Sequence, residues 1–126
     1  MKRLLFLLTM TLVSVSIVAY DFEVDGICYE IISSTDNTVS VTNKYEQQYT
    51  GDVVIPEKVL YNGKTYSVTS IDYEAFLSCT NLTSVHLPNS IITIADYAFA
   101  HCCSLTSITI PNSVTTIGES ALADCI

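Results

Sequence analysis

The sequence predicts an α/β solenoid, with parallel strands on its concave side and short helices or 3₁₀ turns on the return side. The main observation is a repeat: residues 68–90 and 91–113 align without a gap, and ten of their 23 positions are identical. Those positions are Ile71/Ile94, Ala75/Ala98, Phe76/Phe99, Cys79/Cys102, Leu82/Leu105, Thr83/Thr106, Ser84/Ser107, Pro88/Pro111, Asn89/Asn112 and Ser90/Ser113.

A third, incomplete copy of the repeat runs from Val114 to Ile126. A fixed period in the twenties with leucine or isoleucine at set offsets is the sequence signature of a leucine-rich-repeat solenoid. We therefore expect leucine-rich repeats at 68–90, at 91–113 and, in part, at 114–126.

The first 19 residues are typical of a secretory signal peptide. Lys2 and Arg3 precede an apolar stretch of 15 residues, from Leu4 to Val18, and the small residue Ala19 follows. The alternative is a membrane anchor, but a stretch of this length is short for a bilayer, which takes about 20 apolar residues. We expect cleavage near Ala19, a secreted or cell-surface location, and no membrane insertion of the remaining chain.

The remaining chain is strongly acidic. Without residues 1–19 it keeps Lys44, Lys58 and Lys64 against 13 carboxylates, which is a formal net charge of −10. This charge argues against nucleic acid or an anionic lipid surface as a partner.

Residues 20–67 lie outside the complete repeats and are predicted to form an N-terminal β cap. Asp-Gly at 25–26 and Asn-Gly at 62–63 supply the positive φ angles that tight hairpin turns need. Residues 53–56 resemble the strand end of later repeats and are interpreted as a degenerate first repeat. Such a cap covers the apolar core that the first repeat would otherwise expose. Strands are expected at 22–24, 27–32, 38–42, 59–61 and 65–68.

Each repeat divides into a strand and a return segment. Apolar and polar residues alternate in Val85–Leu87 and Ile108–Ile110, as in a strand, and a proline closes each segment. The apolar members are expected to point inward. Their polar neighbours point outward and form the candidate concave binding face: Ser84, His86, Ser107 and Thr109. On the return side, Phe76 and Phe99 are expected to fill the core from short helices or 3₁₀ turns.

The repeated pattern Ile-x-x-x-Ala-Phe-x-x-Cys-x-x-Leu-x-x-Ile-x-Ile-Pro resembles the BspA-like leucine-rich repeats of surface proteins. The resemblance covers residues 68–126 well and 53–67 loosely. It implies a curved solenoid with a role in adhesion or in binding a host protein. Members of this family often carry many repeats, whereas here we expect a third repeat that stops at Ile126 and no C-terminal cap or sorting domain.

Three of the five cysteines lie one period apart, at Cys79, Cys102 and Cys125. Stacked side chains point in parallel, which favours buried free thiols. A disulfide is the alternative, because neighbouring coils about 5 Å apart lie within the range of Cα separations that disulfides span. Cys103 replaces the polar Thr80 of the previous repeat, so it is expected to be exposed.

No cofactor, metal site or catalytic constellation is predicted. Structural zinc takes about four ligands at recognisable spacing, and the chain has only His86 and His101 beside its cysteines, with no Cys-x-x-Cys pair. Both histidines occupy positions that vary between the repeats, and no glycine-rich phosphate loop is present.

The sequence therefore predicts a secreted or surface-displayed, non-catalytic repeat protein. Its expected partner is a protein, such as a host matrix or surface protein, bound through the concave face. The alternatives are a truncated repeat fragment with a structural or capping role, and a small enzyme with a site in residues 20–67. We also expect self-association through the C-terminal end, where the third repeat lacks its following strand.

Overall fold

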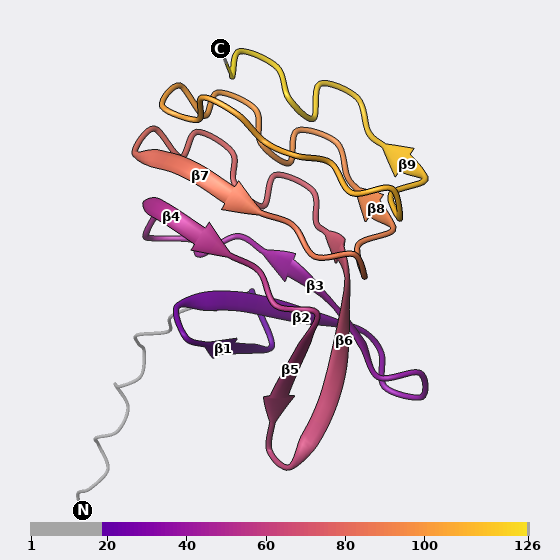
Figure 1. Cartoon of the computed structure of the whole chain (residues 1–126). Coiled ribbons are helices and arrows are strands. Elements are labelled where there is room, and N and C mark those ends of the chain that lie inside the picture. Colours follow the sequence, from indigo (N-terminus) through magenta and orange to yellow (C-terminus); the bar gives the residue numbers. More distant parts are fainter. Residues whose placement is uncertain (1–18, 126) are drawn as a thin grey trace, which may run out of the picture.

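The computed structural model describes residues 19–125, which form nine strands and the turns between them. In chain order the strands are β1 (Phe22–Val24), β2 (Ile27–Ser33), β3 (Thr38–Thr42), β4 (Gly51–Val54), β5 (Lys58–Tyr61), β6 (Lys64–Ile71), β7 (Leu82–His86), β8 (Thr93–Ile94) and β9 (Thr116–Ile117). Stacked coils carry β7, β8 and β9, and the hairpins β1–β2 and β5–β6 lie at the other end of the molecule (Figure 1).

The hairpins form where the two-residue turns predicted them. Asp25 and Gly26 have φ angles of 52° and 83°, and Asn62 and Gly63 have φ angles of 51° and 75°. Two successive positive φ angles match the right-handed twist of the flanking strands, which is why such turns close tight hairpins. Strands β1 and β2, and likewise β5 and β6, pair antiparallel across these turns.

Two parallel ladders join the coils. On one side, Ile71 of β6 pairs with Ile94 of β8, which pairs with Ile117 of β9. On the other side, β4 pairs with β7, and Val85 of β7 forms a single parallel bridge with Ile108. The sequence analysis predicted only the second ladder, and it expected a full strand at 108–110 where the structure has that single bridge.

The return side was predicted as short helices or 3₁₀ turns, and this prediction is wrong for residues 19–125, which contain turns and no helix. Left-handed residues recur there with the period of the repeat, and a left-handed residue interrupts the run of right-handed φ and ψ angles that a helix requires. They are Glu74, Tyr97 and Ser120 at one position of the coil, and Ser78, His101 and Asp124 four residues later. In the same part of the chain, no helix is long and apolar enough to cross a membrane.

Backbone hydrogen bonds stack these turns on one another. The N–H of Phe76 donates to the carbonyl of Ala98 at 2.7 Å, and the N–H of Phe99 donates to the carbonyl of Ala121 at 2.8 Å. Residues two positions before and after each phenylalanine bond in the same way. The turns therefore form a third ladder between coils, although they contain no strand.

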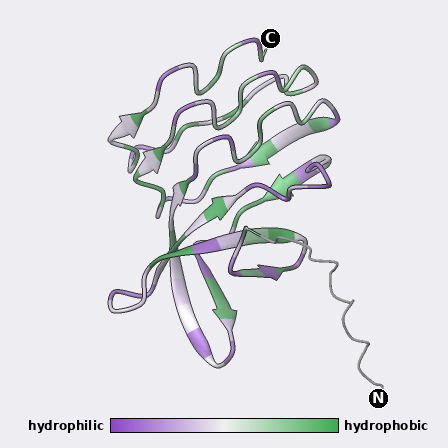
Figure 2. Ribbon diagram, turned by 180° about the vertical axis from the view of Figure 1, so that it is seen from behind, coloured by the Kyte–Doolittle hydropathy of each residue, from purple (hydrophilic) through white to green (hydrophobic). Residues whose placement is uncertain are grey.

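The core lies inside the coils and includes the predicted Phe76 and Phe99. Its phenylalanines stack, with the ring centroids of Phe76 and Phe99 4.9 Å apart and their planes 12° apart. Phe76, Phe99, Ile71, Ile94, Leu82 and Leu105 are all at most 1 % exposed. Hydrophobic segments mark β4, β5 and β7 when the molecule is seen from behind (Figure 2).

The cap joins this core through Tyr49, a contact that the sequence analysis missed. The Tyr49 ring lies 4.5 Å from that of Phe76, so the phenylalanine column continues into the cap. The Tyr49 hydroxyl donates to the Thr42 carbonyl at 2.7 Å and accepts from the Cys28 N–H at 3.0 Å. Burial raises the pKa of this phenol well above its usual range. Tyr49 precedes Phe76 by 27 residues rather than 23, so a search at the repeat period does not find it.

Candidate functional site

The predicted binding residues lie on the outward face of the sheet that contains β4 and β7. Parallel partners point to the same face, and alternate residues point to opposite faces. Val53 and Val85 are paired and point into the core, where they are 8 % and 4 % exposed. Their neighbours therefore point outward, and so do the neighbours of Ile108, which pairs with Val85.

Six outward side chains result, in two rows that run across the coils. We call this set the strand face. One row contains Asp52, Ser84 and Ser107, and the other contains Val54, His86 and Thr109. All but the half-buried Ser84 are exposed. The structure thus brings the four predicted residues together on one surface and adds Asp52 and Val54.

Asp52 is the polar centre of the strand face. Its Oδ1 atom accepts a short hydrogen bond from the Ser84 hydroxyl and lies 2.8 Å from His86 Nε2. The Ser84 hydroxyl and then the His86 ring stabilise the carboxylate, so the pKa of Asp52 lies below its usual value. The side chains of His86 and Asp52 remain 61 % and 57 % exposed, so a partner can reach both.

This cluster has the residue types of a serine hydrolase but not the geometry. In a catalytic triad the histidine lies between the serine and the carboxylate, so that it can accept the serine proton. Here one oxygen atom of Asp52 contacts both Ser84 and His86. No hydrogen bond joins the His86 ring to the Ser84 hydroxyl, so the cluster lacks the serine–histidine contact of a catalytic triad.

A shallow hollow of about 170 Å³ lies on the strand face where β7 meets the next coil. Its lining includes all four predicted residues, together with Val85, Leu87 and Ile108. The volume is below the roughly 300–1,000 Å³ of small-molecule sites. The hollow is therefore smaller than a typical small-molecule site.

Asp52 and Val54 were missed because the spacing from the degenerate first repeat to the next one is not 23. Aligning Pro56 with Pro88 places Asp52 on Ser84 and Val54 on His86, which is the register that the structure has. The β5–β6 hairpin lies between these prolines and lengthens the spacing. An alignment of Pro56 with Pro88 that allowed a gap for this hairpin would have identified Asp52 and Val54 from the sequence.

The periodic cysteines form a ladder of free thiols in the core. The Cys102 thiol donates to the Phe76 carbonyl at 3.0 Å, and the Cys125 thiol donates to the Phe99 carbonyl at 2.9 Å. Burial raises the pKa of the Cys102 thiol to about 12. These thiols satisfy carbonyl groups of the turns, and Cys103, as predicted, is exposed.

His101, Cys102 and Cys103 do not converge on a common point. His101 Nδ1 lies 3.1 Å from Asp124 Oδ2, whereas the Cys102 thiol points into the core. Across residues 19–125, no three histidine, cysteine, aspartate or glutamate side chains are grouped to hold a metal ion.

Stacked coils with leucine at a fixed position, joined by parallel ladders over a column of phenylalanines, define a leucine-rich-repeat protein. The family model of the BspA type leucine rich repeat region matches residues 54–126 in six copies. The chain belongs to this family. A search of curated proteins found no match.

Three solved structures illustrate the similarity. A leucine-rich repeat protein from Bacteroides ovatus is 34 % identical with a TM-score of 0.77, and the match covers 84 % of this chain and 27 % of that one. A leucine rich cell surface protein from Faecalibacterium prausnitzii is 27 % identical with a TM-score of 0.69, over 82 % and 28 % of the two chains. A leucine-rich repeat protein from Bacteroides capillosus is 31 % identical with a TM-score of 0.67, over 78 % and 70 %. The chain thus spans about a quarter of the length of the first two relatives.

Proposed function

We propose that this chain is a secreted or cell-surface protein that binds another protein, without catalysis, through its strand face. The observation that carries the proposal is the set of six outward side chains held in two rows by parallel pairing above a buried core. Stacked repeats present surfaces of this kind to macromolecular partners. The partner class that we propose is a host matrix or surface protein.

The chemistry of the strand face supports a protein partner. Its polar groups are hydroxyls, one imidazole and one carboxylate, which is a poor match for the phosphates of nucleic acid. His86 and Asp52 offer a donor and an acceptor beside the apolar Val54, as mixed protein interfaces do. The name of the Faecalibacterium prausnitzii relative, a cell surface protein, supports the proposed location.

The rest of the chain has roles consistent with this proposal. Residues 1–19 serve as a signal peptide that is removed near Ala19, residues 20–67 cap the stack, and residues 68–126 form a curved solenoid of leucine-rich repeats. A standard interface buries about 800 Å² of each partner. The strand face covers only neighbouring coils, so we expect weak binding from this chain alone.

A pull-down against purified matrix and surface proteins tests the proposed partner class. The full chain is immobilised beside a Ser107→Arg/Thr109→Arg variant, which places two large cations on the strand face. Thr115→Arg is the matched control, because Thr115 is exposed next to β9 on the other ladder. Capture by the wild type and the control, but not by the double variant, supports the proposal. Equal capture by all three would place binding elsewhere.

We also propose that the chain self-associates through its third coil. A hollow of about 250 Å³ lies there, lined by Leu105, Ile108, Leu122 and Cys125 together with Ser107 and Asp124. The N–H groups of Ser120, Leu122 and Asp124 continue the donor series of the turn ladder and have no acceptor in residues 19–125. Burial of an apolar surface is not screened by salt, whereas charge repulsion is screened beyond about 8 Å at physiological ionic strength.

Sedimentation of the full chain at micromolar concentration, in low and in high salt, tests this second proposal. We expect a dimer or larger species under both conditions. Leu122→Arg should return the chain to a monomer, and Leu60→Arg, at an exposed apolar position on β5, should not. A wild-type monomer in both salts would contradict the proposal.

A further inference from the structure

The second edge of β4 is unpaired in residues 19–125. On its first edge, the Gly51 N–H donates to the Asn81 carbonyl at 2.9 Å, and the Ile55 N–H donates to the His86 carbonyl at 3.1 Å. In a strand of a parallel pair, the N–H and C=O of one residue point to the same edge, and those of the next residue point to the opposite edge. Gly51, Val53 and Ile55 therefore face β7, and Asp52 and Val54 point their backbone groups away from it.

These backbone groups have no partner among the described residues. The register pairs β4 only with β7, and no further backbone hydrogen bond involves the N–H or C=O of Asp52 or Val54. Two donors and two acceptors therefore lie along one short edge. In Figure 1, β4 lies between β7 above it and the β1–β2 hairpin below it.

Two adjoining hollows separate this edge from the hairpin. The first has a volume of about 250 Å³ and the second about 340 Å³, and Asp25, Ile27 and Val54 line both. Neither is lined by a residue of β7, so both lie on the unpaired side of β4. We call the two hollows together the edge groove.

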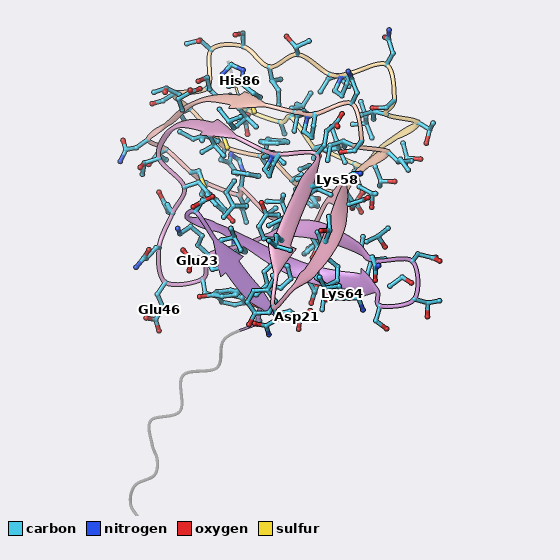
Figure 3. All side chains as sticks on the ribbon, turned by 60° about the horizontal axis from the view of Figure 1, so that its bottom comes forward. Asp21, Glu23, Glu46, Lys58, Lys64 and His86 are labelled. Carbon is cyan, nitrogen blue, oxygen red and sulfur yellow. The ribbon has the colours of Figure 1, made fainter. Side chains whose placement is uncertain are left out.

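The edge groove has an apolar wall and a fixed floor. Val54 is 61 % exposed and Leu60 of β5 is 64 % exposed, and both line the second hollow. The Lys44 ammonium donates to the Gly26 carbonyl at 2.8 Å and lies 3.6 Å from Glu23, which holds the turn that forms the floor. Figure 3 turns this end of the molecule forward and labels Glu23 and Lys58.

The charge of the edge groove also differs from that of the rest of the molecule. Lys44 and Lys58 line it together with Asp25 and Asp52, so its charges balance. The whole chain, in contrast, has a formal net charge of −8. A chain segment that is repelled by the acidic surface elsewhere meets no net repulsion here.

We propose that the edge groove binds an extended peptide segment of another protein, which adds to β4 as a strand. The peptide backbone pairs with the backbone groups of Asp52 and Val54, and an apolar side chain at alternate positions contacts Val54 and Leu60. Strand addition of this kind obtains affinity from main-chain hydrogen bonds and specificity from pockets for alternate side chains. Pro56 ends the edge, because proline has no N–H to continue the pairing, so the bound segment is about four residues long.

This site adjoins the strand face and shares Asp52 and Val54 with it, but its main-chain pairing uses the backbone groups of these two residues. The strand face presents side chains above the sheet, whereas the edge groove presents backbone groups in the plane of the sheet. The bound peptide would extend the same sheet by one strand on the side of β4 that faces the hairpin.

Fluorescence polarisation with a labelled, terminally blocked hexapeptide of alternating threonine and valine tests the proposal on the full chain. We expect saturable binding that weakens by about tenfold in Val54→Pro, which removes one edge donor and leaves the pairing with β7 intact. Val54→Ala keeps the donor and is the matched control, with an expected loss below about threefold. Thr109→Arg, on the strand face, should bind as the wild type does, which distinguishes this site from the proposed function.

Two N-methylated forms of the peptide provide a measurement that leaves the protein unchanged. One form is methylated on the N–H groups of the valines and the other on those of the threonines. Strand addition predicts that one form binds and the other does not, because alternate N–H groups point to opposite edges. Equal binding of both forms, the absence of saturable binding to the wild type, or undiminished binding by a folded Val54→Pro variant would each overturn the proposal.

Discussion

The cap and the coils reach a similar degree of burial by different means. In the coils, the same residue types recur at the same position, so each contact is a copy of the one before, as with Phe76 on Phe99. In the cap, single residues make contacts that occur once, such as the Tyr49 hydroxyl between Thr42 and Cys28. This difference indicates that the coils are stabilised by many copies of the same contact, whereas the cap is stabilised by a few groups that have no equivalent elsewhere in the described residues.

The largest expected effect tests the coils. Phe99→Ala should lower the free energy of unfolding by about 3–5 kcal/mol, because it leaves a cavity between Phe76 and the third coil. Phe99→Leu is the matched control, since leucine occupies the equivalent position at 122, and it should cost much less. Chemical denaturation measures both values. A loss for Phe99→Ala no greater than that for Phe99→Leu would show that the column is not tightly packed.

The next effect tests the junction of the two regions. Tyr49→Phe keeps the ring against Phe76 but leaves the buried Cys28 N–H without its acceptor, so it should cost about 1–3 kcal/mol. Tyr61→Phe is the control, because no hydrogen bond of its hydroxyl is present in the structure of residues 19–125, and it should change stability by no more than about 0.5 kcal/mol. Equal melting curves for the two variants would refute the role given to the Tyr49 hydroxyl.

A smaller effect tests a hairpin turn of the cap. Gly63 has a φ of 75°, and a Cβ added there meets nothing within 4 Å, so Gly63→Ala should cost about 1–2 kcal/mol through backbone strain alone. Gly63→Asn should cost less, because asparagine adopts left-handed angles more readily. The thermal unfolding midpoint reports both. A greater loss for asparagine than for alanine would indicate a steric cause instead.

The smallest effect concerns reactivity and leaves stability unchanged. A thiol reagent at neutral pH should modify Cys103 quickly and Cys102 only on unfolding, because Cys103 is exposed whereas burial holds the pKa of Cys102 at about 12. Mass spectrometry of peptides after timed labelling distinguishes these neighbours, and Cys103→Ser should remove the fast phase. Fast labelling of Cys102 in the folded chain would place the ladder of thiols outside the core.

The sequence predicted the coils because their determinants repeat. The buried phenylalanines, the leucines and the outward residues at 84, 86, 107 and 109 all follow from one period. The hairpin turns also followed from local chemistry at Asp25-Gly26 and Asn62-Gly63. The predicted helices failed because residues such as Glu74 and Ser78 adopt left-handed angles that their side chains do not favour. Tertiary hydrogen bonds between coils impose those angles.

The parts that were not predicted depend on contacts across an irregular interval. Tyr49 reaches Phe76 and Asp52 reaches Ser84 across an interval that the β5–β6 hairpin, at the end of the cap, makes longer than the repeat. The unpaired edge of β4 depends on where the β1–β2 hairpin lies, which no local pattern specifies. A search for a repeated period identifies contacts that recur in each coil. It does not identify contacts that occur once, such as those between the cap and the first complete coil.

The hydrogen bonds between coils have a direction with an electrical consequence. On the turn side, the N–H groups of one coil donate forward to the next coil, as Phe76 does to Ala98. Beside β8 and β9 the direction reverses, as when Ala95 donates back to Ile71 and Gly118 to Ile94. Peptide dipoles of about 3.5 D each therefore point in opposite directions along the stack in these two groups of bonds. In a helix all the peptide dipoles point the same way and their partial charges add at its ends, whereas in this stack the dipoles on the turn side and beside β8 and β9 partly cancel.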